Sequence, residues 1–315
     1  MGFMYFRPLL PFALGLALIL SSSVFTVVGA VNALLQGLLF TFVVCLPIWR
    51  TGRISYVDIG WPWGLVVLAA VSFIFSDGYW ARSLIVTLAV ATIGLRMGIG
   101  AVKMWQGGYL KKEFPRYQYQ RVRWQQEGKD NVALAAQVEA IVQGLANASF
   151  LAMPIFIIST NAVPQFFLLE LLGLAIWAIF LVAENTADMQ KLGFLKSMKK
   201  QGKSGEVCDV GLWRYSRHPN YFCEWMVWNG LVIAAIPSWL ALGSTLPLMM
   251  WVLLGLATLM ASFFMYRTLV YSTGAIPSEY YSEQKRPGYK AYQQRTNRFF
   301  PAPPRPVTEP SEKPR

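Results

Sequence analysis

The sequence predicts an all-α integral membrane protein, a bundle of seven or eight transmembrane helices with a cytoplasmic cap made of loops. Of its 315 residues, 55% are apolar and only 14% are charged, whereas soluble domains carry about 25% charged residues. Apolar runs of about 20 residues recur along the chain, and such a run crosses the hydrocarbon core of a bilayer. The basic residues gather in a few loops. Together these features exclude a soluble enzyme, a disordered chain and a disulfide-rich secreted scaffold.

Eight apolar stretches are long enough to cross a membrane as helices. They lie at roughly 9–29, 31–49, 60–76, 80–101, 133–159, 165–184, 222–242 and 246–267. The first stretch lacks an Ala-x-Ala cleavage pattern and runs directly into the second, so we expect a retained helix rather than a signal peptide. The third stretch is short and the first two are almost continuous, which leaves the count at seven or eight.

Lysine and arginine gather on one side of these spans. That side holds the N-terminus, the C-terminal tail and the loops near 50–59, 102–132 and 185–221. The opposite side holds only short links, and Arg82 is its one clear basic residue. The positive-inside rule makes the basic side cytoplasmic, with both termini inside, as in a bacterial inner membrane. The net charge of +12 is thus explained by topology and by attraction to anionic lipids, and we expect no nucleic-acid partner.

The chain divides into N-terminal transmembrane helices at 1–49, a main membrane domain at 50–301 and a tail at 302–315. The tail is rich in proline and charge and is expected to be disordered. The whole chain has three cysteines, Cys45, Cys208 and Cys223. They have no metal-binding spacing, so we expect neither a metal site nor a structural disulfide. No obligate protein partner is indicated.

Ionisable residues within apolar spans are costly, so each one is a candidate functional residue. They are Asp58, Arg96, Glu139, Glu170, Glu184, Asp188 and Glu224. The alternative is that each is neutralised by an arginine or reaches the interface from a helix end. Glu139 and Glu170 have no motif around them, which favours that alternative. Glu184 and Asp188 are four residues apart and therefore share one helix face, and with Glu224 they lie near the segment described next.

The segment GLWRYSRHPNYFCEW, residues 211–225, contains the only histidine of the chain, His218. Arg214, Arg217, His218 and Asn220 supply cationic and hydrogen-bonding groups of the kind that recognise phosphate and amide groups. Pro219 disfavours helix at the residue before it, which predicts a bent loop that leads into the seventh span. The alternative is a belt of Trp, Tyr and Arg that anchors a helix end at the interface.

This segment resembles the signature of the DUF1295 and steroid 5α-reductase group, which is related to the sterol C14-reductases. Three further stretches carry the resemblance: DIGW at 58–61, AENTADMQK at 183–191 and YKAYQQRTNRFFP at 289–301. It covers roughly residues 50–301 with its motifs in the same order. The RHPxY pattern is also shared with isoprenylcysteine-type methyltransferases.

The resemblance implies a membrane-embedded, NADPH-dependent reductase that acts on a lipid enone, such as a 3-oxo-Δ4 steroid, entering from the bilayer. Matched by motif, Asp188 and Asn220 bind the cofactor and Glu224 holds the nicotinamide carboxamide. Arg267 and Tyr280 are candidates for a cofactor-binding Arg and Tyr. This chain has Glu184 where the steroid enzymes have an asparagine, and Asp58 is the nearest match for the carboxylate that faces the substrate carbonyl.

Enone reduction places negative charge on the carbonyl oxygen, so a donor must already face that oxygen. We expect Glu224 and Asn220 to fix the nicotinamide, and Arg214, Arg217 and basic residues of the 102–132 loop to hold the phosphates. A protonated Asp58 would donate to the carbonyl. Two alternatives stay open: a methyltransferase that uses S-adenosylmethionine, and a non-catalytic membrane scaffold.

Overall fold

The computed structural model describes residues 2–306, and in that range the chain forms helices and turns without a strand. Within it, eight helices are long and apolar enough to cross a membrane: Phe3–Ser21, Thr26–Thr51, Ile54–Phe75, Trp80–Gln106, Val132–Ser159, Leu168–Lys200, Pro219–Ser244 and Leu248–Lys285. They correspond in order to the eight predicted stretches. The predicted all-α fold class is therefore confirmed, and the eight apolar helices are consistent with a multi-pass membrane protein.

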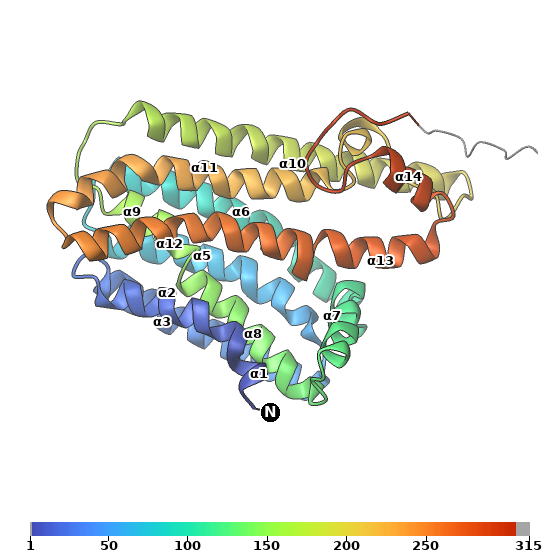
Figure 1. The fold of residues 1–315 in the computed structure, drawn as a ribbon, viewed down its shortest axis with the longest axis horizontal. Coiled ribbons are helices and arrows are strands. Elements are labelled where there is room, and N and C mark those ends of the chain that lie inside the picture. Colours follow the sequence, from blue (N-terminus) through green and yellow to red (C-terminus); the bar gives the residue numbers. More distant parts are fainter. Residues whose placement is uncertain (1, 307–315) are drawn as a thin grey trace, which may run out of the picture. The chain divides into compact units, whose positions relative to one another are not determined.

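Several of these spans consist of more than one helical segment (Figure 1). The first four spans are α1 (Phe3–Phe6) with α2 (Leu10–Ser21), α3 (Thr26–Leu39) with a π-helical turn (Phe40–Cys45) and α4 (Leu46–Thr51), α5 (Val57–Phe75), and α6 (Trp80–Gln106). The last four are α8 (Val132–Ala148) with α9 (Ala152–Ser159), α10 (Leu168–Lys200), α11 (Pro219–Ala241), and α12 (Leu248–Arg267) continued by a π-helical turn (Thr268–Ser272) and α13 (Ala275–Lys285). Two helices are too polar to span: α7 (Pro115–Gln126) and α14 (Tyr289–Arg295).

The sixth and eighth helices extend further than the sequence predicted. The stretch expected to end at 184 continues as α10 to Lys200, so the first half of the expected 185–221 loop is helical. Hydropathy detects only the part of a helix that crosses hydrocarbon, while the helix itself continues until a residue breaks it. Here the break comes at Gly202, whose φ of 68° is the left-handed conformation typical of a glycine just beyond a helix end.

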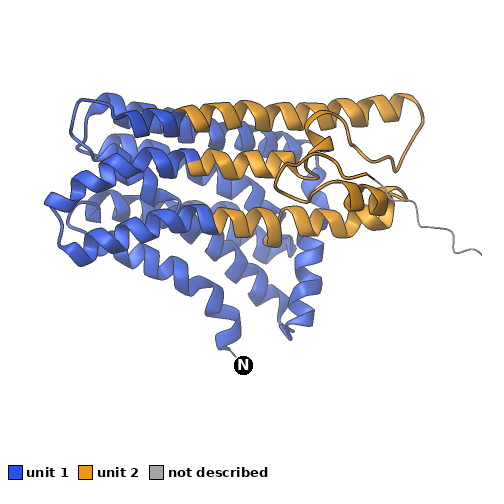
Figure 2. Ribbon diagram, turned by 45° about the horizontal axis from the view of Figure 1, so that its top comes forward, with its two compact units in different colours: residues 1–174, 230–263 blue, residues 175–229, 264–315 orange. Residues whose placement is uncertain are grey.

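The chain folds as two compact units, shown separately coloured in Figure 2. Unit 1 comprises residues 1–174 and 230–263, and unit 2 comprises residues 175–229 and 264–315. In unit 1, α5 and α6 are joined by a short link and pack closely, because glycine lets the backbones approach. A Cβ atom on Gly94 of α6 would lie 2.6 Å from the carbonyl oxygen of Pro62 in α5.

A buried ion pair in unit 1 accounts for the one basic residue that the topology rule left out. The Arg82 side chain at the start of α6 is 1% exposed, and its Nε donates to Oε1 of Glu170 over 2.7 Å. Its two terminal nitrogens donate to the backbone oxygens of Asn161 (3.1 Å), Val163 and Gln165 (2.6 Å). Arg82 is thus neutralised, and it also holds the link between α9 and α10. This confirms the interpretation that Glu170 is paired with an arginine.

Removing the arginine should therefore destabilise the fold strongly. In Arg82→Leu, the Glu170 carboxylate stays buried without its cation, which we expect to cost about 3–5 kcal/mol. The measurement is thermal unfolding of the purified protein in detergent, with Arg50→Leu as the matched control because Arg50 is exposed at the end of α4. The double variant Arg82→Leu/Glu170→Leu should recover part of the loss. An unchanged unfolding temperature for Arg82→Leu would contradict the structural role of the pair.

Candidate functional site

The loop before α11 is anchored to α10 by backbone and side-chain hydrogen bonds. Trp213 is buried in the 3₁₀ turn Gly211–Arg214, and its Nε1 donates to the carbonyl oxygen of Ala187 over 2.9 Å. The backbone nitrogen of Leu212 donates to Oε1 of Gln190 over 2.9 Å. Gly211 has a φ of 55°, a left-handed conformation that favours glycine, and a Cβ atom there would lie 2.4 Å from the Gln190 side chain. As predicted, the RHP stretch is a bent loop, and α11 begins at Pro219.

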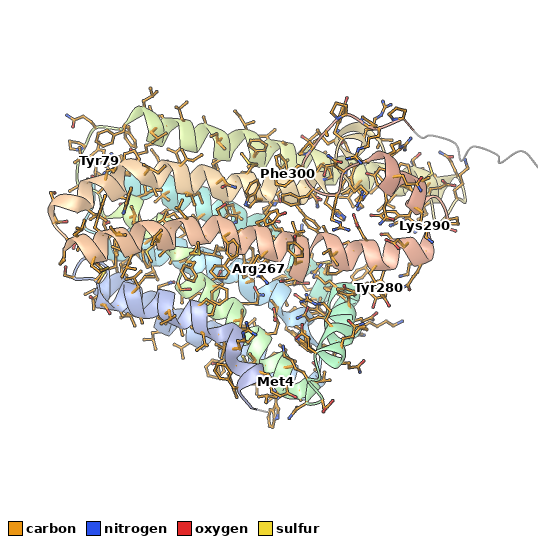
Figure 3. All side chains as sticks on the ribbon, viewed as in Figure 1. Met4, Tyr79, Arg267, Tyr280, Lys290 and Phe300 are labelled. Carbon is orange, nitrogen blue, oxygen red and sulfur yellow. The ribbon has the colours of Figure 1, made fainter. Side chains whose placement is uncertain are left out.

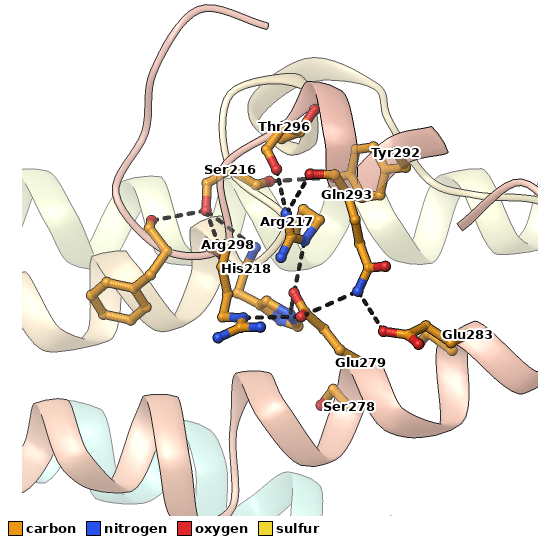
Figure 4. A network of polar contacts seen from close by, with 12 residues as sticks. Ser216, Arg217, His218, Ser278, Glu279, Glu283, Tyr292, Gln293, Thr296 and Arg298 are labelled. Atoms are coloured by element: carbon orange, nitrogen blue, oxygen red, sulfur yellow. Dashed lines mark hydrogen bonds and ion pairs between the residues drawn. The ribbon is translucent and has the colours of Figure 1, made fainter. Parts of the chain in front are cut away.

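Arg217 lies at the centre of a buried polar network within unit 2 (Figure 4). Its Nε donates to Oε1 of Glu279 over 2.7 Å, and its Nη1 donates to the backbone oxygens of Gln293 (3.1 Å) and Thr296. Glu279 is 3% exposed and accepts a further bond from Nε of Arg298 over 2.9 Å. The guanidinium of Arg217 thus joins the loop to α13 and to the end of α14, which gives it a positioning role in unit 2.

His218 belongs to the same network. Its Nε2 lies 3.3 Å from Oε1 of Glu279, and its ring stacks on Tyr221 with centroids 5.4 Å apart. Burial lowers the pKa of His218 to about 4, although the contact with Glu279 opposes that shift. The imidazole is therefore neutral at physiological pH and is held inside the protein. Both Arg217 and His218 thus contact Glu279, and their cofactor-binding roles stay predictions.

The C-terminal segment closes over this loop through further hydrogen bonds. The hydroxyl of Tyr292 donates to the carbonyl oxygen of Trp213. The hydroxyl of Ser216 donates to the carbonyl oxygen of Phe299 over 2.9 Å. The backbone nitrogen of Ala302 donates to the oxygen of Tyr215 over 2.9 Å. The start of the tail is therefore held in place, whereas the rest of the expected disordered tail, from residue 307, lies outside the described residues.

Four predicted site residues lie on two helices of unit 2, and one hydrogen bond joins the two pairs. Glu184 and Asp188 lie one turn apart on α10, and Asn220 and Glu224 lie one turn apart on α11. Nδ2 of Asn220 donates to Oδ1 of Asp188 over 3.1 Å. Glu184 is 4% exposed and Glu224 is 7% exposed. We call these four residues the acidic–amide cluster.

One atom of this cluster points to a ligand. Oδ1 of Asn220 is buried and has no hydrogen-bond partner among the described residues. A buried acceptor without a partner is costly, and a carboxamide NH₂ group would satisfy it. Carboxylates nearby can accept the second hydrogen of such a group. The residues therefore fit the nicotinamide amide of NADPH, the cofactor that the resemblance implied.

Unit 2 also contains a cationic pocket that sequence reasoning missed. Its volume is about 390 Å³, and its charged and polar lining comes from Lys199 at the end of α10, Lys203, Ser204 and Glu206 in the following loop, and Arg286 after α13. Phe194, Leu195 and Met198 of α10 supply an apolar wall. The sequence did show basic residues here, but nothing in it indicated that Arg286 would lie beside Lys199.

The acidic–amide cluster and the cationic pocket share one face of α10. Glu184, Asp188, Lys191, Leu195 and Lys199 recur at intervals of three or four residues, which places them on one side of the helix. Lys191 and Leu195 line a small cavity of about 30 Å³ that also touches Trp213 and His218. Leu195 borders the cationic pocket as well. A continuous strip thus connects the two sites within unit 2, and we call it the α10 strip.

Three of the predicted cofactor-binding residues are exposed. Arg214 is exposed, and so are Arg267 at the end of α12 and Tyr280 on α13 (Figure 3). Their cofactor-binding roles stay predictions. Among residues 2–306, no group of three His, Cys, Asp or Glu side chains is arranged to hold a metal ion.

Asp58 lies in unit 1, and its contacts there count against the predicted donor role. It accepts a hydrogen bond from the hydroxyl of Tyr117 over 2.6 Å and an ion pair from Arg116. Burial, together with the neighbouring Asp58 carboxylate, raises the pKa of Tyr117 well above its usual value, so the phenol stays protonated and donates. Both oxygens of Asp58 thus act as acceptors. Tyr117 is buried, and no motif around it had marked it as a candidate site residue.

Comparison with known proteins places the chain in a family. The family described as "Protein of unknown function (DUF1295)" matches residues 42–296. This chain belongs to the DUF1295 family. No curated protein and no solved structure matches it. The DUF1295 match covers the RHP loop, the acidic–amide cluster and the cationic pocket, and it leaves most of the first two spans outside.

The buried histidine predicts a pH-dependent stability. Its pKa in the folded state is about 4, below the ordinary value of about 6.5. Between these two values the unfolded chain binds a proton that the folded chain does not, so stability falls as the pH decreases from 6.5 to 4, by on the order of 3 kcal/mol. His218→Gln should lose this contribution. The measurement is the difference in unfolding free energy between the two proteins as a function of pH.

A direct readout is available because the chain has one histidine. In protein purified without a histidine tag, the single imidazole NMR signal should remain that of the neutral ring down to about pH 5. A titration centred near 6.5 would show that the ring is solvated and that the network around Glu279 does not form.

Proposed function

We propose that this DUF1295 protein is a membrane-embedded, NADPH-dependent reductase that transfers hydride to a carbon–carbon double bond conjugated to a carbonyl group in a lipid, such as a steroid-like 3-oxo-Δ4 enone. The observation that carries the proposal is the α10 strip, which has the acidic–amide cluster at one end and the cationic pocket at the other. The apolar spans support a substrate drawn from the bilayer.

The amide end would orient the reactive ring of the cofactor. Asn220 supplies an acceptor without a partner through Oδ1 and is itself fixed by Asp188. Glu224, one turn further along α11, is buried and adds a carboxylate acceptor. Two acceptors on one helix face can bind both hydrogens of a single carboxamide. The bound cofactor supplies the hydride, and these residues determine which face of its ring is presented.

The cationic end would hold the phosphates. Lys199, Lys203 and Arg286 converge on one pocket, and guanidinium and ammonium groups are the usual ligands of phosphate oxygens. The apolar wall beside them suits a nucleobase. This replaces Arg217, whose guanidinium is occupied by Glu279, in the role that the sequence suggested for it.

The separation of the two ends indicates an extended ligand. Asp188 and Lys199 are eleven positions apart on α10, which corresponds to about 16 Å along the helix axis. A ligand that reaches both ends must carry an amide at one end and phosphates well away from it. A nicotinamide dinucleotide has that layout.

A methyltransferase that uses S-adenosylmethionine is the principal alternative. The carboxylates Glu184, Asp188 and Glu224 suit its positively charged sulfonium and ammonium groups. S-adenosylmethionine has no phosphate, however, so it would leave Lys199, Lys203 and Arg286 without a function. A non-catalytic scaffold would use neither end of the strip.

Nucleotide titration of the purified protein in detergent tests the proposal. NADPH should bind, and Asn220→Ala and Glu224→Gln should each weaken binding about tenfold. The first variant removes a buried acceptor, and the second replaces a charged acceptor with a weaker neutral one. The double variant Lys199→Ala/Lys203→Ala should also bind NADPH more weakly. The difference in affinity from wild type should decrease as the salt concentration rises, because salt screens the attraction between the lysines and the phosphates. Lys290→Ala is the matched control, since Lys290 on α14 is exposed and does not line the pocket.

S-adenosylmethionine is titrated in parallel. Binding of S-adenosylmethionine that depends on Glu224 but not on Lys199 would favour the methyltransferase. If the folded protein binds neither NADPH nor S-adenosylmethionine, the scaffold alternative is favoured. Undiminished NADPH binding in the Asn220 and Glu224 variants would defeat the assignment of the amide end.

A further inference from the structure

The small cavity of unit 2 that touches Trp213 and His218 is flanked by two basic side chains. Its volume is about 30 Å³, which is space for about one or two water molecules. Lys191 of α10 and Arg286, the residue that follows α13, both line it. Both side chains are half-buried. The cavity therefore places two cations beside the same small space.

The charges of these two residues are not neutralised by an ion pair. Nζ of Lys191 lies over the Trp213 ring, 4.0 Å from its centroid, and forms no hydrogen bond or ion pair within residues 2–306. Nη1 of Arg286 donates to Oγ of Ser282 over 2.7 Å, and no carboxylate in that range forms an ion pair with the guanidinium. A ring face attracts a cation, but it offers no oxygen to the three N–H donors of the ammonium. Donors from both cations are thus left for a ligand.

The other residues around the cavity do not supply the missing negative charge. Arg217 also lines it, but Glu279 already neutralises that cation. Burial raises the pKa of the Cys208 thiol, so this lining residue stays a neutral thiol. Burial also raises the pKa of Tyr289, whose phenol stays protonated and can donate a hydrogen bond. Glu206 is the one carboxylate among the described lining residues, but its side chain is exposed and pairs with neither cation. The balancing charge must therefore come from outside the chain.

We propose that this cavity binds a chloride ion between the ammonium of Lys191 and the guanidinium of Arg286. A chloride ion is close to a water molecule in size, so the volume suits it, whereas the larger phosphate and sulfate ions exceed it. Charged donors form strong hydrogen bonds to an anion, and the phenol of Tyr289 adds a neutral donor. The bound ion links α10 to the end of α13 and thereby stabilises unit 2.

The chloride site adjoins the cationic pocket but is a different site. Leu195, Glu206 and Arg286 line both spaces, whereas Lys191 lines only the small cavity and Lys199 only the cationic pocket. Arg286 has five N–H donors, enough for a ligand on either side. Chloride binding requires no nucleotide and is tested without one, so its failure would leave the reductase assignment untouched.

Thermal unfolding of the full-length protein in a nonionic detergent tests the site. Wild type should unfold at a temperature about 2 °C or more higher in sodium chloride than in sodium gluconate of equal ionic strength, because a ligand that binds only the folded state stabilises it. Lys191→Met keeps a side chain of similar length beside Trp213 but removes the charge, and it should lose this difference. Arg286→Met should lose it as well. Lys196→Met is the matched control and should keep the difference, since Lys196 on α10 is exposed and lines neither space.

Bromide can locate the ion directly. In wild-type crystals soaked in sodium bromide, an anomalous-scattering peak should lie between Lys191 and Arg286, and it should be absent from Lys191→Met. Equal unfolding temperatures of the wild type in the two salts would show that water alone fills the cavity and would overturn the proposal. So would a chloride effect that persists in both variants. If the variants do not fold, wild-type crystals without bromide in this cavity would overturn it equally.

Discussion

The structure depends on one constraint: a polar group removed from water must find its partner within the protein. Arg82 and Glu170 show it in unit 1, where one guanidinium binds a carboxylate and the carbonyl groups of a link between helices. Arg217 and Glu279 show it in unit 2. In both units a buried arginine donates to backbone carbonyl oxygens that lack a partner within a helix. The buried arginines therefore hold the connecting segments in place.

The network around Glu279 also determines what the RHP loop can do. Because Arg217, His218 and Arg298 all contact one carboxylate, the loop is fixed by residues that lie more than 60 positions further along the chain. That fixed loop leads directly into α11 and sets where Asn220 and Glu224 begin. Arg217 and His218 of the motif are thus positioning groups, and the proposed function assigns ligand binding to the asparagine and glutamate that follow them.

The sequence was sufficient to predict the helical spans, because twenty apolar residues have few alternatives to a transmembrane helix. It also predicted the turn at His218, since Pro219 restricts its neighbour. It failed where partners are distant in sequence: nothing near Arg217 indicates Glu279, and nothing near Lys199 indicates Arg286. The sequence also predicted that the sixth span ends at residue 184, whereas α10 continues to Lys200. The last turns of the helix are charged and lie beyond the hydrocarbon, so a search for apolar residues does not detect them.

The extension of α10 gives the proposed function a physical rationale. Its last turns carry Lys191, Lys196, Lys199 and Lys200, which are too costly to place in hydrocarbon, whereas Glu184 and Asp188 lie toward its apolar part. A dinucleotide aligned with this helix would keep its phosphates among cations near water and insert only its uncharged ring toward the bilayer. Under the proposed function, one helix would thereby join a highly charged cofactor to a substrate that stays in the lipid. A sixth span that ended at 184 would place neither Asp188 nor Lys199 on this helix.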